Sequence, residues 1–389
     1  MLAWFSAALV YRRDRATDTE KKSEMLYTTD MVEDRVSSMQ PAVDRAIRDN
    51  PHGIAIYGAG FVGVWAADYL RSVGTAITHF IDRDPEKEKT EISGVPVVQP
   101  TDPVVSSDPT IYVATRHSVK QVMEAMAHYG ANLISFDAFY VVHNYQRFAH
   151  VRDHYLSDGR SVETYNAILM AMLTGSPKSC RDVMVKDMYF APPEFSATFG
   201  EIYLDAGAFV GDTVEQFIWQ NMGTFRHLYA FEPGKKQFAA LQTRMARLYR
   251  EWAIEENDVT LVNGGLAEND GRMACTFVHD DPIRHGLANQ VGDRDRTVPV
   301  YALDSFLQGR PITFLKADIE GMEMDLLRGA QSTIKTHRPK MAICAYHYPS
   351  DLYEIAEYVR DLVPEYRFRL MQHVPILGDY VLYCYCEDR

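Results

Sequence analysis

Strands alternate with helices twice along this chain, and each series opens with a glycine-rich turn. In the first series, an apolar strand over 54–57 is followed by the turn 58–63, GAGFVG, and an apolar-periodic helix. In the second, a strand over 202–206 is followed by the turn 207–211, GAFVG, and another helix. Strands joined by crossover helices form parallel sheets. We therefore expect an α/β fold with two doubly wound, Rossmann-like sheets in tandem.

The 389 residues are too many for one ordinary core, and their pattern predicts four segments. These are an N-terminal helical segment over 1–50, a Rossmann-like domain of nucleotide-binding type over 51–140, a helical linker over 141–198, and a second α/β domain over 199–389. Strand-like runs over 366–371 and 380–385 predict an antiparallel end to the second sheet.

Charge and composition exclude several classes of protein. A net charge of −13 makes the chain a poor general binder of nucleic acid, because phosphate contacts need clustered Lys and Arg. The five cysteines show no zinc spacing, which favours buried thiols in a reducing compartment. The apolar run 1–10 is too short to span a bilayer and predicts a short helix or ordered tail. We predict a cytoplasmic protein without a membrane span. The sequence leaves open whether the protein forms a homo-oligomer.

The second glycine turn has acids at both ends. Asp205 ends the strand before the turn, and Asp212 begins the helix after it. A dinucleotide would place its pyrophosphate at that helix N-terminus, where two carboxylates would repel it. They favour a ligand with an ammonium and a sulfonium instead. S-adenosylmethionine has both groups and no phosphate.

Two further strand ends support the same ligand. Glu232 ends the next strand, where an acid can accept hydrogen bonds from both ribose hydroxyls. Glycines after the third strand would let the backbone approach the adenine. The predicted cofactor-binding residues are Asp205, Ala206, Gly207, Gly211, Asp212, Thr213, Glu232, Gly265 and Leu266.

From about residue 200 to 386 the chain resembles FkbM-type methyltransferases. The motifs that carry the resemblance are LDAGAFVGDT, YAFEP, GLAENDG and above all KADIEGME over 316–323, followed by LRGA. The resemblance implies a class I methyltransferase fold for 199–389. It also implies S-adenosylmethionine-dependent O-methylation of a sugar, polysaccharide or natural-product hydroxyl. The expected partner is thus a small-molecule or carbohydrate acceptor.

Four residues at neighbouring strand ends are the candidates for catalysis. Asp318 or Glu320 could take the proton of the acceptor hydroxyl, and Lys316 could hold a charge partner or the substrate. His347 follows the next strand, and a histidine titrates near neutral pH. The alternative is structural: acids are favoured in a first helical turn, and a histidine at a strand end often has no role in catalysis.

Two other features receive plainer interpretations. The acids that follow Lys316 would suit Mg²⁺, but we favour a solvated first turn as their explanation and assign no metal ligand. A polar loop over 279–295 could cover the acceptor, and it also fits an exposed connection.

The first glycine turn has the context of a dinucleotide fingerprint, with Gly58, Gly60 and Gly63 between strand and helix and Asp82 at the end of the next strand. The stretch from residue 54 to 97 is similar to Rossmann-like domains of sugar-modifying and polysaccharide-biosynthesis proteins. NAD(P) or a nucleotide sugar could bind here, or the glycines could serve packing alone. The alternative function is accordingly an NAD(P)-linked oxidoreductase or a nucleotide-sugar-binding protein.

Overall fold

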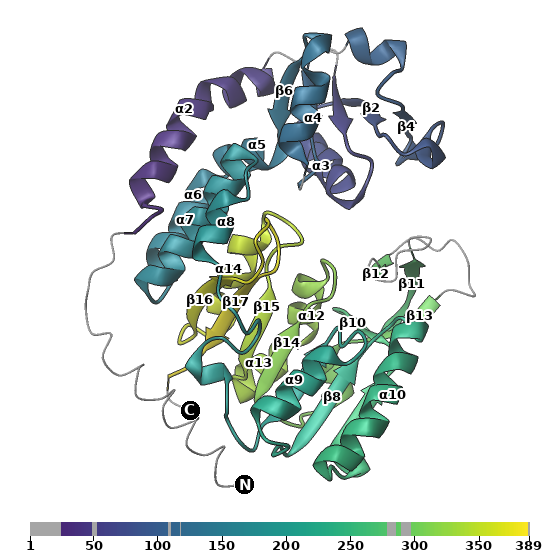
Figure 1. The fold of residues 1–389 in the computed structure, drawn as a ribbon, viewed down its shortest axis with the longest axis vertical. Helices are drawn as coiled ribbons and strands as arrows, with labels where there is room; N and C mark the ends of the chain where they lie inside the picture. The colour runs from purple at the N-terminus through teal and green to yellow at the C-terminus, as the bar shows by residue number, and fades with distance from the viewer. Residues whose placement is uncertain are drawn as a thin grey trace.

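The computed structural model describes residues 25–48, 53–107, 110–116, 118–277, 285–288 and 297–387. The predicted N-terminal run over 1–10 and most of the predicted cover loop over 279–295 lie outside these residues. An N-terminal α/β part, a group of helices and a C-terminal α/β part follow one another along the chain (Figure 1). Among the helices described, none has the length and apolar character needed to cross a bilayer.

The N-terminal sheet has the strand order β3-β4-β2-β1-β5-β6, and every pairing except β3 with β4 is parallel. Its strands are β1 (Ile54–Tyr57), β2 (Ile77–Ile81), β3 (Glu91–Ile92), β4 (Val95–Val98), β5 (Thr110–Val113) and β6 (Asn132–Ser135). Helices α3 (Phe61–Ser72) and α4 (Val119–Met126) pack on its two faces. The sequence pattern predicted β1, β2, β5 and β6, but it missed the short hairpin of β3 and β4.

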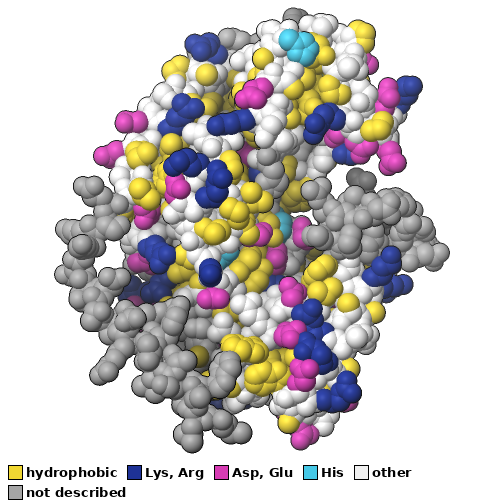
Figure 2. All heavy atoms as spheres, viewed as in Figure 1, with side chains coloured by type: hydrophobic (Ala, Val, Ile, Leu, Met, Phe, Trp, Pro, Cys, Tyr) yellow, Lys and Arg dark blue, Asp and Glu magenta, His cyan; other side chains and the backbone are white. Residues whose placement is uncertain are grey.

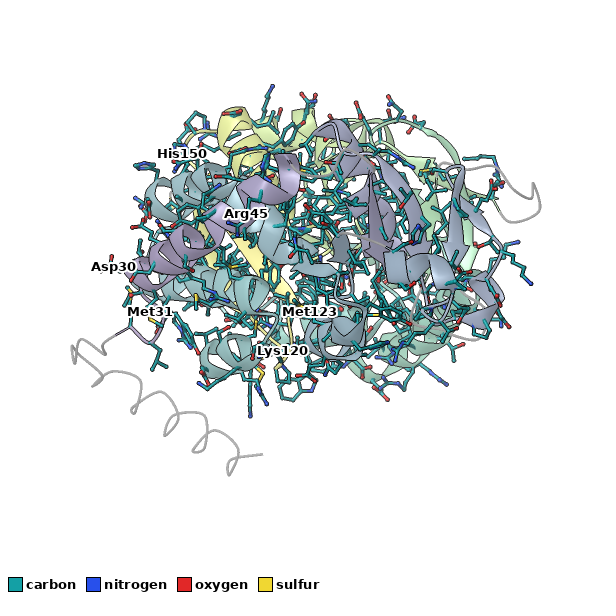
Figure 3. The ribbon with its side chains drawn as sticks, turned by 90° about the horizontal axis from the view of Figure 1, so that it is seen from above. Asp30, Met31, Arg45, Lys120, Met123 and His150 are labelled. Carbon is teal, nitrogen blue, oxygen red and sulfur yellow. The ribbon has the colours of Figure 1, made fainter. Side chains whose placement is uncertain are left out.

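Helices fill the segment between the two sheets, as the pattern predicted. They are α5 (Phe136–His143), α6 (Tyr145–His154), α7 (Gly159–Thr174) and α8 (Lys178–Val183), and the earlier helix α2 (Thr29–Arg48) packs against α5 and α7. Figure 3 shows this end of the molecule, with Asp30 and Arg45 on α2, His150 on α6 and Lys120 on α4. The apolar run over 133–136 predicts a strand, but this strand ends at Ser135 and Phe136 begins α5.

The C-terminal sheet has the order β16-β17-β15-β14-β7-β8-β9. Its strands are β7 (Ile202–Ala206), β8 (His227–Phe231), β9 (Val259–Val262), β14 (Phe314–Ala317), β15 (Lys340–Cys344), β16 (Arg367–Gln372) and β17 (Tyr380–Tyr385). The predicted antiparallel strand is β17, which lies between β15 and the edge strand β16 rather than at the edge itself. The helices on this sheet include α9 (Asp212–Gln220), α10 (Lys235–Trp252), α12 (Glu323–Gly329), α13 (Gln331–His337) and α14 (Asp351–Leu362).

A third, four-stranded sheet adjoins the C-terminal sheet. The sequence pattern predicts extra strands over 272–278 and 297–301, which belong to it, but not that they form a sheet of their own. It contains β10 (Gly265–Leu266), β11 (Gly271–Phe277), β12 (His285–Ala288) and β13 (Thr297–Tyr301), in the order β10-β13-β11-β12. Because β10 follows β9 directly, this small sheet begins beside the carboxyl ends of the large one.

The two α/β parts share one continuous hydrophobic core. It extends from β1 through α5 and α7 to one face of the C-terminal sheet. Across this junction the hydroxyls of Tyr140 and Tyr353 are hydrogen-bonded, and the rings of Phe148 and Tyr353 are 4.9 Å apart. Shared burial of this kind fixes the two parts relative to each other. The segment boundaries expected from the sequence stay a prediction.

The N-terminal glycines differ in what their backbone contacts. A Cβ on Gly63 would lie 1.8 Å from the carbonyl oxygen of Gly58, whereas a Cβ on Gly60 would have no heavy atom within 4 Å. Gly63→Ala should therefore destabilise the protein by about 3 kcal/mol, the upper part of the range for overpacking. Gly60→Ala is the matched control and should cost less than about 1 kcal/mol, as expected at a helix N-cap. Chemical denaturation measures both values, and equal losses would contradict the packing role.

A histidine joins the segment before the second sheet to the hairpin of β16 and β17. His373 contacts the Val185 carbonyl oxygen through Nδ1 at 3.2 Å and the Tyr383 hydroxyl through Nε2 at 2.9 Å. A neutral imidazole satisfies both contacts, because Nδ1–H donates and Nε2 accepts. Burial, opposed by the Val185 bond and by Asp187, lowers the pKa of His373 from 6.5 to about 4.

This lowered pKa gives a stability prediction. The neutral His373 contributes stability above pH 6.5, and that contribution is lost as the pH falls toward 4, because the unfolded chain takes up the proton first. Between pH 7.5 and 5 the wild type should lose roughly 2 kcal/mol more unfolding free energy than His373→Gln, which cannot titrate. Urea denaturation at the two pH values measures the difference. Parallel losses in both proteins would refute the assignment.

Candidate functional site

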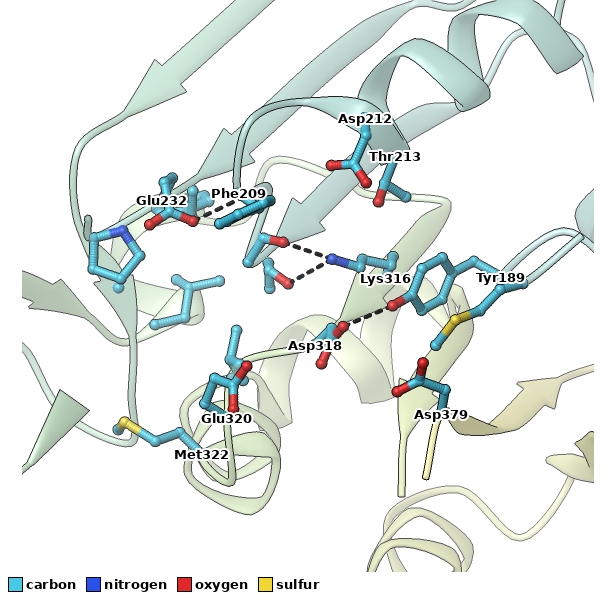
Figure 4. Close-up of a pocket in the computed structure, with 18 of the residues that line it drawn as sticks. Tyr189, Phe209, Asp212, Thr213, Glu232, Lys316, Asp318, Glu320, Met322 and Asp379 are labelled. Atoms are coloured by element: carbon cyan, nitrogen blue, oxygen red, sulfur yellow. Dashed lines mark hydrogen bonds between the residues drawn. The ribbon is translucent and has the colours of Figure 1, made fainter. Parts of the chain in front are cut away.

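A cavity of about 390 Å³ opens at the carboxyl ends of β7, β8 and β14 (Figure 4). Most of its walls come from the glycine turn after β7, the ends of β8 and β14, and β10. Met188 and Tyr189 come from the segment before the sheet, and Asp379 comes from the loop between β16 and β17. Of the predicted cofactor-binding residues, those that line the cavity are Ala206, Gly207, Asp212, Thr213, Glu232, Gly265 and Leu266.

Asp205 and Gly211 are the two predicted cofactor residues outside this lining. Asp205 is fully buried, and its Oδ1 lies 2.9 Å from Lys316 Nζ on the neighbouring strand, where the two residues are in register. Lys316 Nζ also donates to the carbonyl oxygen of Gly207 at 2.7 Å. Gly211 has a φ of +82°, and a Cβ there would lie 2.7 Å from Leu241. Asp205 therefore holds the turn after β7 in place through Lys316. Gly211 allows α10 to pack closely against this turn.

Lys316 carries a positive charge inside the protein. Burial alone would lower the pKa of Lys316, but the negative charges of Asp205 and Asp318 outweigh burial and raise it. The ammonium also lies over the ring of Tyr189, 5.1 Å from its centroid. The structure thus gives Lys316 a charge partner, as one of the two sequence interpretations expected.

Gly207 marks the closest approach of two strand ends. Its φ is +83°, and a Cβ there would lie 1.9 Å from the carbonyl oxygen of Asp318. Only glycine combines this backbone conformation with this contact. The turn after β7 is therefore fitted to the segment after β14.

Glu232 is buried at the end of β8 and faces the same turn. One carboxylate oxygen accepts from the Phe209 N–H at 2.8 Å, and the other accepts from the Gly234 N–H at 2.6 Å. Phe209 has a φ of +47°, an uncommon value for a residue with a side chain. Strained residues of this kind cluster at ligand sites.

Asp318 lies at the other end of the cavity, held by two tyrosines. Tyr189 donates to its Oδ2 at 2.8 Å and Tyr346 donates to its Oδ1 at 3.0 Å. Burial would raise the pKa of Asp318, but Lys316, His347 and these two hydrogen bonds lower it overall. Asp318 is therefore a carboxylate at neutral pH and a weak base.

His347 lies behind Asp318 and Glu320, and it does not line the cavity itself. Its Nδ1 is 3.2 Å from Glu323, and its Nε2 is 3.7 Å from both Asp318 Oδ1 and Glu320 Oε2. Burial would lower the pKa of His347, but the three carboxylates outweigh burial and raise it to about 10. Of the four candidate catalytic residues, Lys316, Asp318 and Glu320 thus line the cavity, and His347 lies behind two of them.

Sequence reasoning missed Tyr189, Tyr346 and Asp379. Tyr346 sits beside His347 at the end of a predicted strand, so its position was available. Tyr189 and Asp379 lie in connections without a motif, and only the tertiary fold brings them to Asp318 (Figure 4). Burial and the charge of Asp318 raise the pKa of Asp379, against the opposing effects of His347 and Tyr346.

The N-terminal glycine turn faces the C-terminal part of the molecule. Asp82 accepts from the Ala59 N–H at 2.8 Å and from Lys87 Nζ at 3.0 Å, so its carboxylate is engaged within the turn region. Phe61 packs on Tyr348 with ring centroids 4.8 Å apart. Arg116, after β5, donates to the carbonyl oxygens of Tyr346 and His347. These contacts hold the segment that carries His347 and do not by themselves indicate a nucleotide.

Comparison with known proteins identifies the class of enzyme. Residues 205–370 match the family model described as the methyltransferase FkbM domain. The matched segment is therefore a methyltransferase domain of the FkbM type, which confirms the resemblance drawn from its motifs. No curated protein matches the chain.

Among solved structures, the fold is similar to methyltransferase FkbM from Methylobacillus flagellatus KT. The two share 22% sequence identity over 92% of this chain and 98% of that one, with a TM-score of 0.58. An rRNA methylase from Streptococcus thermophilus matches 49% of this chain and 89% of its own at 17% identity, with a TM-score of 0.31. UDP-D-quinovosamine 4-dehydrogenase from Vibrio fischeri matches 21% of this chain and 74% of its own at 26% identity, with a TM-score of 0.19.

The buried pair below the cavity gives a testable prediction. Lys316→Met leaves Asp205 buried without its cation, which should cost about 3–5 kcal/mol of unfolding free energy. The double variant Lys316→Met with Asp205→Leu removes both charges and should recover most of that loss. Chemical denaturation of the single and double variants measures the coupling. A double variant no more stable than the single one would mean that Lys316 acts mainly through the backbone carbonyls.

Proposed function

We propose that this protein transfers a methyl group from S-adenosylmethionine to a hydroxyl of a sugar, polysaccharide or related natural product. The observation that carries the proposal is the chemistry of the cavity at the carboxyl ends of β7, β8 and β14. Its acidic lining residues are Asp212, Glu232, Asp318, Glu320 and Asp379, and its one lysine is already paired with Asp205.

This charge balance favours a cationic ligand without phosphate. A sulfonium and an ammonium are attracted to carboxylates, whereas a pyrophosphate is repelled by them. Glu232 is assigned to the ribose hydroxyls, because it is a buried acid at the end of β8 that lines the cavity beside the turn after β7. The backbone of Gly265 and the side chain of Leu266 provide an apolar wall for the adenine. Asp212, at the start of α9, is the negative partner we assign to the ammonium.

The opposite end of the cavity fits a hydroxyl-bearing acceptor. Tyr189, Tyr346 and Asp318 form a hydrogen-bonded group there, and Asp379 and Glu320 lie beside it. Such groups orient polyols by hydrogen bonds. A sugar or related natural product is also what FkbM-type resemblance implies.

The transfer is a displacement at the methyl carbon. S-adenosylmethionine supplies the methyl group: the carbon–sulfur bond breaks with its electron pair kept by sulfur, and a carbon–oxygen bond forms to the acceptor. The hydroxyl proton must leave, and we assign it to Asp379, because a raised pKa makes this carboxylate a better base than Asp318. Glu320, half-exposed at the same end, is the second carboxylate in reach of an acceptor.

Calorimetric titration tests the donor site without knowledge of the acceptor. The wild type should bind S-adenosylmethionine, and Glu232→Ala should bind it about 10- to 100-fold more weakly, the effect expected for hydrogen bonds to a charged group. Glu256→Ala removes an exposed acid remote from the cavity and should leave binding unchanged. NAD serves as the comparison ligand.

The outcomes separate the alternatives. Glu232 also anchors two backbone N–H groups, so the melting temperature of the variant shows whether it folds. If a folded Glu232→Ala protein bound S-adenosylmethionine as tightly as the wild type, the assigned ribose contact would be wrong. Binding of NAD but not of S-adenosylmethionine would overturn the proposed function.

A further inference from the structure

One side chain near the cavity is buried in a way that ordinary hydrogen bonding does not explain. His347 is 6% exposed, and neither of its ring nitrogens has a hydrogen-bond partner among the described residues. On the other side of the ring, Nδ1 faces Glu323, whose carboxylate is fixed by the N–H groups of Ile319 and Gly321 at 2.9 and 3.1 Å. The ring is therefore oriented by Glu323, and Nε2 is directed at the two remaining acids.

The distances from Nε2 to the carboxylates of Asp318 and Glu320 suit a cation shared between them better than a direct hydrogen bond. Nε2 lies 3.7 Å from Asp318 Oδ1 and 3.7 Å from Glu320 Oε2, beyond the range of a hydrogen bond. Two ligand atoms that each lie ~2.1 Å from one ion are ~3.0 to ~3.4 Å apart, depending on the geometry. A movement of a few tenths of an ångström by either carboxylate would bring its oxygen and Nε2 to the separation of two ligands of one ion.

The arrangement around His347 also matches the way proteins orient metal-binding histidines. One ring nitrogen contacts a carboxylate, and the other nitrogen binds the metal after giving up its proton, which metal binding releases. Asp318, Glu323 and His347 place one ligand atom each within 4.8 Å of one another. Acidic side chains and a His gather in the hollow between the two halves of the molecule (Figure 2).

We propose that a divalent cation binds between His347 Nε2 and the carboxylates of Asp318 and Glu320, with Glu323 holding the opposite ring nitrogen. One nitrogen and two oxygen ligands suit a first-row cation such as Mn²⁺. Asp318 and Glu320 line the cavity, so the open coordination positions face the place assigned to the acceptor.

The cation's role, which rests on the proposed function, is to bind the acceptor hydroxyl. Coordination lowers the pKa of a bound hydroxyl, so that its proton leaves to a nearby carboxylate before or during methyl transfer. The neighbouring cation, Lys316, does not compete for this place, because its ammonium is bound to Asp205 and the Gly207 carbonyl oxygen.

Electron paramagnetic resonance of Mn²⁺ tests the site on the full chain. Free Mn²⁺ gives a six-line signal that is lost on binding, and the wild type should remove one equivalent. Glu320→Gln should weaken binding at least tenfold, and its side chain is 51% exposed, so the variant should fold. His347→Ala should abolish binding, and Glu323→Gln should weaken it about 10- to 100-fold, as expected for a carboxylate that orients the ligand.

Asp212→Asn and Glu232→Ala are matched controls, because both remove an acid of the same cavity away from His347, and both should bind Mn²⁺ like the wild type. The metal site would be refuted if the wild type left the Mn²⁺ signal unchanged and calorimetric titration with Zn²⁺ or Mg²⁺ gave no heat. In that case Nε2 would carry a proton instead of a metal ion. The metal site would also be refuted by Glu320→Gln and His347→Ala proteins that bind like the wild type. Mn²⁺ binding without S-adenosylmethionine binding would instead refute the proposed function and leave the metal site intact.

Discussion

The ion pair between Asp205 and Lys316 is the interaction on which the site depends. It joins two adjacent strands at their carboxyl ends, and the same ammonium holds the backbone of the turn that follows β7. A buried pair adds little net stability compared with apolar residues of the same size, so its value here is geometric. It brings the turn with Gly207 and the segment with Asp318 into contact, and both walls of the cavity follow from that contact.

Much of the fold follows from local pattern. The strands β1, β2, β7, β8 and β14 are short apolar runs closed by glycine or an acid, and parallel pairing orders their ends along one edge. The positions of Glu232, Asp318 and His347 around one site could therefore be predicted, because each ends or follows a recognisable strand. The hairpin of β3 and β4 could not, because β3 has only two residues and β4 contains Pro96, which argues against a strand.

Other parts of the site depend on tertiary structure alone. Asp379 reaches Asp318 only because β17 returns antiparallel beside β15. Tyr189 arrives on a connection whose path is set by His373 and Tyr383. Asp205 looked like a ligand residue, because sequence shows that it ends a strand but not that Lys316 in the next strand neutralises it. A sequence motif describes neighbouring residues only, so it cannot show which distant segments of the chain come together in the fold.

The contacts of Phe61 and Arg116 with the C-terminal part constrain how the sequences of the two parts can diverge in evolution. Arg116 reaches the backbone that leads to His347, and Phe61 lies against Tyr348 beside Gly321. The amino-terminal sheet and the methyl-transferring half therefore do not vary independently. A chimaera in which one half came from a distant homologue would lack matching contacts between its two halves. Phe61, Arg116 and Tyr348 would have to be exchanged together.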